Sequence, residues 1–446
     1  MNMQKYSNKK ILVIGLGMSG VSASKFLADT GAEVTGYDRD VLDIGEFFEE
    51  EYLKKIKFIL GDNNKDIDIA EYDLLVKSPG VPPNNKIIRA AEKIKKPVIS
   101  ELHLGLEMLP EVKVVAVTGT NGKTTTCRLI EYLTGGHSAG NIGQPLTSIV
   151  RKIKKDDIVI LEVSSYQIVY TPNLVPDIGV LLNIFPEHIQ WHGNRDNYIK
   201  AKKNMFIRQS FENVGIFNLD IPDLDFIIKD LKCSKLFFSS RQKVKKGIYI
   251  EGQDIVYTDG RDNKEYLMSK SDIKLPGVHN VENVMAACGV CKVLNIKKIK
   301  NLKKFDLPEH RLQEVGDFKG VKYINDSKAT NMHSTLSALK SIKGPVILLM
   351  GGRSKGQFHP GIEKEIENKV IKIIAFGDSR KEIVNKYSGK VSILAAPTLK
   401  QAVKMAKNCA PEGSTVLLSP GGSSFDEFAN YKDRGNNFKK WVKQTG

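Results

Sequence analysis

The sequence predicts an α/β protein with three domains, each built on a mainly parallel β-sheet that helices cover. The first observation is length, because 446 residues are enough for about three domains of ordinary size. The second is the alternation of short apolar runs, such as ILVI at 11–14 and VILLM at 346–350, with longer helical stretches. Runs of this kind fit parallel strands that are buried on both faces. The third is that the alternation is interrupted twice, around residues 97–113 and 301–312.

The two interruptions divide the chain into predicted domains at residues 1–101, 102–306 and 307–446. We expect the first and third domains to be Rossmann-like and the central one to resemble a P-loop ATPase with a parallel sheet. Pro308 ends the helical stretch before the third domain. Residues 233–275 have the pattern of hairpins and predict a small antiparallel appendage to the central sheet.

The composition excludes several classes of protein. Apolar residues at 41% and charged residues at 26% exclude a disordered chain, a collagen and a coiled coil. The net charge of +16 favours anionic ligands, but no dense basic run is interleaved with aromatics as in proteins that bind single-stranded nucleic acid. No apolar run approaches the roughly 20 residues that cross a bilayer. We therefore expect a cytoplasmic protein that binds no nucleic acid and does not insert into a membrane.

The five cysteines are scattered and odd in number, which fits a reducing compartment better than a disulfide framework. Cys288 and Cys291 have redox or metal spacing, but no second such pair could complete a four-thiolate site. Because the surrounding apolar residues fall at helical spacing, we expect a core helix there.

A glycine-rich loop follows the first predicted strand. Gly15, Gly17 and Gly20 form a GxGxxG pattern between that strand and a helical stretch, and the next strand ends at Asp38. This context suits a nucleotide diphosphate, with the acidic side chain at a ribose. It does not specify NAD, because the amides of a helix N-terminus bind any such anion. The other interpretation is that the glycines only let strand and helix pack closely.

A second and more specific loop follows the strand at 114–118. It reads GTNGKT at 119–124 and leads into a helix. The backbone amides of such a loop can cradle phosphates, Lys123 can reach the terminal phosphates and the Thr124 hydroxyl can ligate Mg²⁺. The leading glycine lies nearer the lysine than in the common P-loop pattern. We predict an ATP site.

Polar residues farther along the chain extend this site. Glu162 ends a predicted strand, where a P-loop enzyme needs a carboxylate near its metal, although a solvated side chain is the alternative. His188 and His192 have a spacing that suits one helix face. No glutamate lies between them as in zinc proteases, so we expect one histidine near a nucleotide-bound metal rather than a zinc site.

Taken in order, these motifs resemble those of the Mur ligases, ATP-dependent enzymes that add amino acids to the peptidoglycan precursor. The resemblance covers all three predicted domains. The strings at 310–311 and 325–331, HR and NDSKATN, are similar to the branch that adds D-glutamate to UDP-N-acetylmuramoyl-L-alanine through an acyl phosphate. It implies a monomer that takes ATP with two Mg²⁺ ions, for which Mn²⁺ can substitute. These enzymes act in peptidoglycan synthesis, and so in cell-wall formation, cell shape and division.

The resemblance also implies roles for single residues. Those implied to bind ATP are Gly119, Thr120, Asn121, Gly122, Lys123, Thr124, Thr125, Asn280, Arg311 and Asp326. Those implied to bind the UDP part are Gly15, Gly17, Ser19, Gly20, Asp38, Arg39, Ser78, Pro79 and Gly80. Those implied to bind D-glutamate are Lys328, Thr330, Lys355, Ser424 and Tyr431. The implied metal ligands are Thr124, Glu162, His188 and Lys202, the last as a carbamate. Lys123, Lys202, His188 and Asn141 are the implied catalytic residues, with Asn141 near the reacting phosphate and acyl group of the substrate.

Two departures from the family pattern accompany the resemblance. After His188 the family usually reads close to HLDRHG, whereas this chain reads HIQWHG, so the salt bridges around the metal ligand must differ. The segment between Lys123 and Asn141 is also several residues shorter than usual.

Three other functions share part of the pattern. A folate polyglutamate or cyanophycin-type ligase shares the P-loop, but it has no reason to carry the UDP-type first domain. An NAD-dependent oxidoreductase would use only the loop at 15–20. A basic P-loop protein that acts on nucleic acid would use the ATP site and the net charge. Neither of the last two explains all three domains together.

Overall fold

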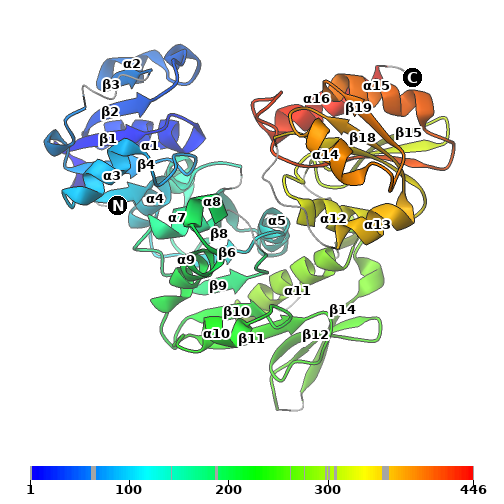
Figure 1. Ribbon diagram of the computed structural model, residues 1–446. Coiled ribbons are helices and arrows are strands. Elements are labelled where there is room, and N and C mark those ends of the chain that lie inside the picture. The colour runs from blue at the N-terminus through cyan, green and yellow to red at the C-terminus, as the bar shows by residue number, and fades with distance from the viewer. Residues whose placement is uncertain are drawn as a thin grey trace. The chain divides into compact units, whose positions relative to one another are not determined.

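The computed structural model describes residues 3–61, 67–141, 143–185, 189–261, 263–275, 277–296, 299, 302–305, 309–353 and 361–444. The chain forms two compact units (Figure 1). The first comprises Met1–Ser269 and Glu282–Lys300, and the second comprises Lys270–Val281 and Asn301–Gly446. The first unit holds two β-sheets and the second holds one, so the predicted α/β class with three sheets is confirmed. The domain boundaries chosen from the sequence stay a prediction.

The first sheet has five parallel strands in the order β3-β2-β1-β4-β5. Its strands are β1 Lys10–Ile14, β2 Glu33–Asp38, β3 Ile56–Leu60, β4 Leu74–Lys77 and β5 Val98–Ser100. Its helices are α1 Met18–Asp29, α2 Glu50–Lys55, α3 Lys86–Lys93 and α4 Glu101–Glu107. Apolar residues of α1 and α4 pack on one face and those of α3 on the other, as β1 is buried on both faces. The strand order reverses between β1 and β4, which is where doubly wound sheets bind ligands.

The second sheet has nine strands in the order β14-β13-β12-β11-β10-β9-β6-β8-β7. Its strands are β6 Lys113–Thr118, β7 His137–Gly140, β8 Ile158–Glu162, β9 Ile178–Leu181, β10 Val214–Asn218, β11 Ser234–Ser239, β12 Gly247–Glu251, β13 Asp254–Thr258 and β14 Lys264–Ser269. The helices that follow these strands are α5 Lys123–Thr134, α6 Leu146–Ile149, α7 Ser165–Val169, α8 Ile189–His192, α9 Arg195–Ile207, α10 Leu224–Ile228 and α11 Val278–Val293.

The predicted appendage is narrower than the sequence indicated. Only β12, β13 and β14 pair antiparallel. β11, which the sequence analysis placed among the hairpins, pairs in parallel with both β10 and β12. After β11 the Ser239 hydroxyl accepts hydrogen bonds from the amides of Arg241 and Gln242. Residues 240–246 then bring the chain back to the level of Phe237, opposite which β12 begins.

The sheet of the second unit has six strands in the order β15-β16-β20-β17-β18-β19. Its strands are β15 Gln313–Phe318, β16 Val321–Asn325, β17 Val346–Gly351, β18 Val370–Phe376, β19 Ile393–Ala396 and β20 Thr415–Gly421. Its helices are α12 Met332–Ser341, α13 Ile362–Lys369, α14 Arg380–Tyr387, α15 Leu399–Cys409 and α16 Tyr431–Lys443. All pairs are parallel except β15 with β16. Separate apolar cores fill its two faces.

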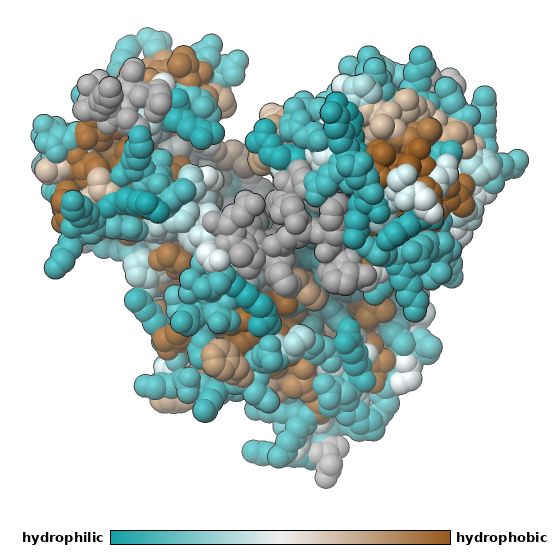
Figure 2. All heavy atoms as spheres, in the orientation of Figure 1, coloured by the Kyte–Doolittle hydropathy of each residue, from teal (hydrophilic) through white to brown (hydrophobic). Residues whose placement is uncertain are grey.

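Short 3-10 helices complete the secondary structure at Met3–Tyr6, Ile44–Glu46, Ile69–Glu71, Val150–Lys152, Lys270–Asp272 and Leu302–Lys304. Hydrophilic side chains cover much of the surface visible in Figure 2, and hydrophobic ones gather there in small separate patches. Within the described ranges, no helix combines the length and apolar character that a membrane span requires. Cys288 and Cys291 are buried in α11, as expected for a core helix.

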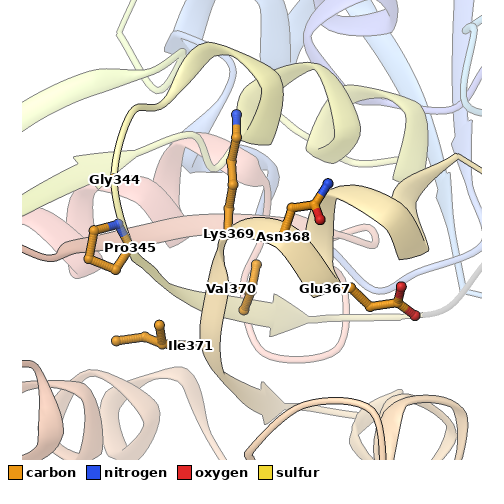
Figure 3. Close-up of a pocket in the computed structure, with 7 residues that line it drawn as sticks. All are labelled: Gly344, Pro345, Glu367, Asn368, Lys369, Val370 and Ile371. Atoms are coloured by element: carbon orange, nitrogen blue, oxygen red, sulfur yellow. The ribbon is translucent and has the colours of Figure 1, made fainter.

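A surface pocket in the second unit lies at the amino ends of β17 and β18 (Figure 3). It is lined by Gly344, Pro345, Glu367, Asn368, Lys369, Val370 and Ile371. Ligands of open parallel sheets bind beyond the carboxyl ends of the strands. This pocket lies at the opposite edge and contains none of the predicted site residues.

Candidate active site

The loop at 119–122 joins β6 to α5 and has the geometry of a phosphate cradle. Gly122, at the N-terminus of α5, has a φ of 86°, which disfavours residues with a Cβ. A Cβ there would also lie 2.3 Å from the side-chain oxygen of Asn283. The amides of Thr120 and Asn121 both donate to the Asn183 side-chain oxygen, at 3.0 and 2.9 Å. Asn183, which follows β9, therefore fixes two amides of the loop, and Asn283 of α11 leaves no room for a side chain at position 122.

Two lysines converge on this loop. The Lys123 ammonium donates to the carbonyl oxygens of Gly119 and Thr120, at 2.9 and 2.8 Å. The Lys202 ammonium, from α9, donates to the Gly119 carbonyl oxygen at 3.0 Å and is 2% exposed. It also lies 4.6 Å from the ring centre of Tyr198. Two cations at one loop make this part of the first unit strongly attractive to anions.

Glu162, at the carboxyl end of β8, connects two other predicted site residues, Thr124 and Asn141. One carboxylate oxygen accepts a hydrogen bond from the Thr124 hydroxyl at 2.8 Å. The other accepts from the Asn141 side-chain amide at 2.9 Å, and the Asn141 backbone amide donates to the Glu162 carbonyl. Asn141 follows β7, which pairs with β8, so the short segment after Lys123 still forms a strand and brings Asn141 to the site. Glu162 is buried and is not a solvated strand end.

The second predicted histidine, His192, has a structural role. Its Nε2 lies 2.9 Å from the Ser165 hydroxyl, and its ring packs against those of Trp191 and Tyr198. Burial and the nearby Lys202 charge lower the pKa of His192 to about 4, which leaves the imidazole neutral at pH 7. His188, the predicted metal ligand, lies outside the described residues.

In the first sheet, the loop between β1 and α1 is closed by contacts that require glycine. Gly15 has a φ of 86°, and a Cβ on Gly20 would lie 1.9 Å from the Gly15 carbonyl oxygen. The Ser78 hydroxyl, at the end of β4, donates to that same oxygen at 2.6 Å. Nothing lies within 4 Å of a Cβ built on Gly17, so the amino end of α1 is open to a ligand.

The remaining predicted residues of the first sheet lie around that loop. Asp38 accepts a hydrogen bond from the Leu16 amide at 2.7 Å, so its carboxylate also fixes the loop. Arg39 has an 80% exposed side chain and an ion pair with Asp40. Ser19 and Pro79 are half-buried, and Gly80 is exposed. The structure thus places these residues along one sheet edge, at the ends of β1, β2 and β4.

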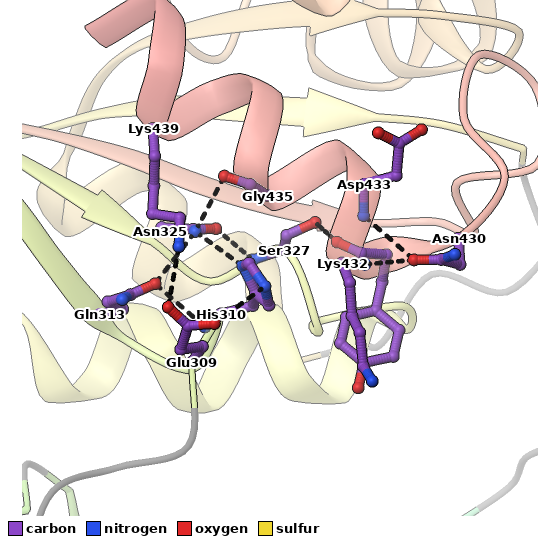
Figure 4. Close-up of polar contacts among 11 residues, drawn as sticks. Glu309, His310, Gln313, Asn325, Ser327, Asn430, Lys432, Asp433, Gly435 and Lys439 are labelled. Carbon is purple, nitrogen blue, oxygen red and sulfur yellow. Dashed lines mark hydrogen bonds and ion pairs between the residues drawn. The ribbon is translucent and has the colours of Figure 1, made fainter. Parts of the chain in front are cut away.

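The second unit gathers polar groups at the end of β16 (Figure 4). The Asn325 side-chain amide lies 3.0 Å from His310 Nδ1 and donates to the Gly435 carbonyl oxygen of α16 at 3.2 Å. Burial lowers the pKa of His310 to about 4. Lys439 of α16 pairs with Glu309 at 2.9 Å. These contacts join the start of β15, the end of β16 and α16.

Asp326, predicted to face the ATP ribose, is buried after β16. Its carboxylate accepts hydrogen bonds from the Ser419 hydroxyl at 2.9 Å and the Leu312 amide at 3.2 Å. Burial raises its pKa to about 7. The Arg311 Nε is buried without a hydrogen-bond partner among the residues that the structure describes. Asn280 is buried and also belongs to the second unit.

Most of the residues predicted to bind D-glutamate lie at the carboxyl ends of β16 and β20. The Lys328 ammonium is 4.9 Å from the ring centre of Tyr431. The Thr330 amide donates to the Lys328 carbonyl oxygen, and Ser424 is buried after β20. Lys355 lies outside the described residues.

Arg434 fixes these two strand ends together, and the sequence analysis missed it. Its guanidinium donates to the Ser327 hydroxyl at 3.0 Å, the Ser327 carbonyl oxygen at 2.8 Å and the Gly422 carbonyl oxygen at 3.1 Å. The side chain is fully buried, and burial lowers its pKa to about 10, so it stays charged. The sequence analysis also missed Asn183, although it follows a strand at the edge where site residues were expected.

Comparisons with known proteins agree with this geometry. Three family models match: "Mur ligase MurD-like, N-terminal domain" at residues 9–100, "Mur ligase middle domain" at 117–291 and "Mur ligase, glutamate ligase domain" at 310–422. A curated protein named UDP-N-acetylmuramoylalanine--D-glutamate ligase, from Syntrophus aciditrophicus (strain SB), is 36% identical over 456 residues, covering 98% of both chains. A protein of the same name from Natranaerobius thermophilus is 37% identical over 460 residues, again covering 98% of both.

Among solved structures, the UDP-N-acetylmuramate-alanine ligase from Thermotoga maritima matches with a TM-score of 0.62. The match covers 98% of this chain and 100% of that chain, at 15% sequence identity. At this identity the likeness concerns the fold alone.

Proposed function

Because this chain belongs to the Mur ligase family, we propose that it is the ATP-dependent ligase that joins D-glutamate to UDP-N-acetylmuramoyl-L-alanine. This reaction is a step in the synthesis of the peptidoglycan precursor. The observation that carries the proposal is the cluster around Glu162, in which the P-loop residue Thr124 and Asn141 hold one carboxylate. Relatives that carry this name and match over 98% of both chains support the choice of amino acid.

The chemistry follows from the need to activate a carboxylate at neutral pH. The carboxylate of UDP-N-acetylmuramoyl-L-alanine attacks the γ-phosphorus of ATP, which forms an acyl phosphate and releases ADP. The amine of D-glutamate then attacks the acyl carbon, an amide forms and phosphate leaves. No nucleophile from the protein is required. Lys123 stabilises the charge on the transferred phosphoryl group, and the loops orient the three substrates and exclude water.

The oxygen donors near the P-loop fit a magnesium ion. The Thr124 hydroxyl and the Glu162 carboxylate lie 2.8 Å apart, and Mg²⁺ prefers a few such protein oxygens together with phosphates and water. When bound, the ion would neutralise charge on the phosphates. In our proposal His188, and Lys202 as a carbamate, would hold a second ion, and Mn²⁺ would be able to substitute for Mg²⁺. A carbamate would turn the Lys202 cation into an anionic ligand.

The proposal also covers the binding of D-glutamate, the oligomeric state and the cellular compartment. Cationic and hydroxyl groups, such as Lys328 and Ser424, suit an amino acid with two carboxylates. We propose that the enzyme acts as a monomer in the cytoplasm, where ATP and nucleotide-linked precursors are present.

The first test measures ATP-dependent phosphate release with UDP-N-acetylmuramoyl-L-alanine and, in turn, D-glutamate, L-glutamate, L-lysine or no amino acid. We expect release only with D-glutamate. Release with another amino acid would overturn the choice of substrate and keep the mechanism. Release that needs RNA, or reduction of NAD, would favour one of the other two classes.

The magnesium site is tested with Glu162→Gln, which keeps the shape of the side chain and removes its charge. We expect the Mg²⁺ concentration for half-maximal phosphate release to rise by about 10- to 100-fold, as is usual when a metal site loses such a group. Glu111→Gln, at an 82% exposed side chain, is the control. An unchanged Mg²⁺ requirement would remove Glu162 from the proposed site.

A further inference from the structure

Lys77 is a buried cation at the carboxyl end of β4, immediately before the Ser78-Pro79-Gly80 loop. It is 2% exposed. Its ammonium makes one hydrogen bond, to the carbonyl oxygen of Ser78 at 3.3 Å. Within the described parts of the chain, no carboxylate forms an ion pair with it. A buried charge without a counter-ion is costly, and accordingly burial lowers the pKa of Lys77 to about 8.

Two aromatic rings from the second sheet's domain surround this cation. The ammonium lies 4.8 Å from the ring centre of Tyr170 and 5.7 Å from that of Trp191. Such contacts partly offset the loss of hydration, but they bring no negative charge. The indole N–H of Trp191 is itself buried without a hydrogen-bond acceptor among the described residues. The Lys77 ammonium and the Trp191 indole N–H are thus two neighbouring hydrogen-bond donors, and among the described residues neither has an anionic partner.

Lys77 and Trp191 lie between the predicted site residues of the Gly15 loop and those of the P-loop, all in the first unit. On one side, Ser78 contacts the Gly15 loop, at the edge where the first sheet binds ligands. On the other, Trp191 is in α8 and packs on His192, whose ring faces Tyr198 beneath the P-loop. The contacts of Lys77 and Trp191 thus connect the residues of the first loop with those next to the P-loop.

We propose that Lys77, together with the indole N–H of Trp191, binds an anionic group of the UDP-linked substrate, either its diphosphate or its terminal carboxylate. This inference rests on the proposed function. The incoming anion supplies the counter-charge that the buried ammonium lacks, and the surrounding rings strengthen the interaction because they exclude water. A lysine with only a packing role would be replaced by methionine at no loss in ligand affinity.

The test is isothermal titration of the full chain, without ATP, with three ligands: UDP, UDP-N-acetylglucosamine and UDP-N-acetylmuramoyl-L-alanine. The proteins are the natural chain, Lys77→Met and the control Lys93→Met, at an exposed position in the last turn of α3. We expect Lys77→Met to weaken binding of the muramoyl ligand by about 10- to 100-fold, the usual effect of losing a hydrogen bond to a charged group. We expect Lys93→Met to bind like the natural chain.

The pattern over the three ligands identifies the anion. Weaker binding of all three assigns Lys77 to the diphosphate, and weaker binding of the muramoyl ligand alone assigns it to the carboxylate. Unchanged affinities for all three ligands would overturn the inference and leave the proposed function intact. If the natural chain binds none of them, the proposed function and the inference both fail.

Two further measurements separate ligand binding from a structural role. Because methionine removes an uncompensated buried charge, the ligand-free Lys77→Met protein should melt at a temperature equal to or above that of the natural chain. Trp191→Phe keeps a ring and removes the N–H, so it should weaken binding of the muramoyl ligand several-fold. A lower melting temperature of Lys77→Met combined with an unchanged affinity of Trp191→Phe would show that the pair only supports the fold.

Discussion

At the residue scale, the two lysines near the P-loop share one carbonyl oxygen as a hydrogen-bond acceptor. Lys123 and Lys202 both donate to the Gly119 carbonyl. These are hydrogen bonds of ordinary length to neutral acceptors, so charged phosphate oxygens would compete successfully for the Lys123 ammonium. The loop therefore positions Lys123 before any nucleotide arrives.

Lys123→Ala should lower the rate of phosphate release by at least about 10²- to 10³-fold, because one charge that stabilises the transferred phosphoryl group is lost. We expect the melting temperature to stay within a few degrees of the natural value, since no buried ion pair is broken. A steady-state assay of phosphate release measures the rate, and a thermal melt measures the melting temperature. Lys113→Ala, at an exposed lysine on β6, serves as the control. Retained activity would be incompatible with the P-loop assignment.

At the element scale, α4 and α6 join the two sheets of the first unit. The Glu101 carboxylate accepts hydrogen bonds from the Thr147 amide and hydroxyl, at 2.7 and 2.8 Å, and Thr147 also contacts Ser22 of α1. The other carboxylate oxygen of Glu101 is buried and has no partner among the described residues. Burial raises the pKa of Glu101 to about 7.

This raised pKa makes the joint sensitive to pH. The folded state holds the Glu101 proton more tightly than the unfolded state does. The contribution of Glu101 to the free energy of unfolding is therefore complete below pH 4.5 and is lost as pH rises through 7. We expect the free energy of unfolding of the natural chain, relative to Glu101→Gln, to fall by about 3 kcal/mol over this range. Urea denaturation of both proteins at pH 4.5, 6 and 8 measures it. A constant difference would contradict the shift.

In the second unit, Arg434 of α16 joins this helix by hydrogen bonds to the ends of β16 and β20. Replacing it by methionine leaves the Ser327 and Gly422 carbonyl oxygens without their donors, which should destabilise this unit by about 3 kcal/mol. The strand ends that carry Lys328 and Ser424 would loosen, so we also expect a higher KM for D-glutamate. Thermal melts and substrate titrations test both effects, with Lys443→Met on the exposed side of α16 as the control. Equal KM values for the two proteins would limit Arg434 to stability.

Local sequence patterns predicted the strands better than they predicted which strands and side chains contact one another. The apolar runs before Gly15 and Gly119 identified β1 and β6, since fully buried strands have a distinctive composition. The parallel pairing of β11 with β12 was missed because only residues 240–246 connect them, and so short a connection usually joins antiparallel strands. Arg434 was missed because its acceptors belong to other segments, 107 and 12 residues away along the chain.

At the scale of the whole molecule, the predicted ligands are divided between the two compact units. The Gly15 loop and the P-loop belong to the first unit, whereas Lys328 and Ser424 belong to the second. Hydrogen-exchange mass spectrometry should therefore show that UDP-N-acetylmuramoyl-L-alanine alone protects peptides that contain residues 10–20 and 74–80. We expect it to leave β16 and β20 unchanged. Protection confined to the second unit would contradict the assignment of the first loop.

The burial of the cysteines has a consequence for the redox chemistry of the enzyme. Cys127, Cys233, Cys288 and Cys291 are buried in the first unit, and Cys409, in the second, is only partly covered. Burial also holds the pKa of Cys127, one turn beyond Lys123, well above its ordinary value, which suppresses the reactive thiolate. Peroxide or an alkylating reagent would therefore reach Cys409 first, on α15. Burial thus shields the thiol of the nucleotide-binding region, Cys127, from oxidation.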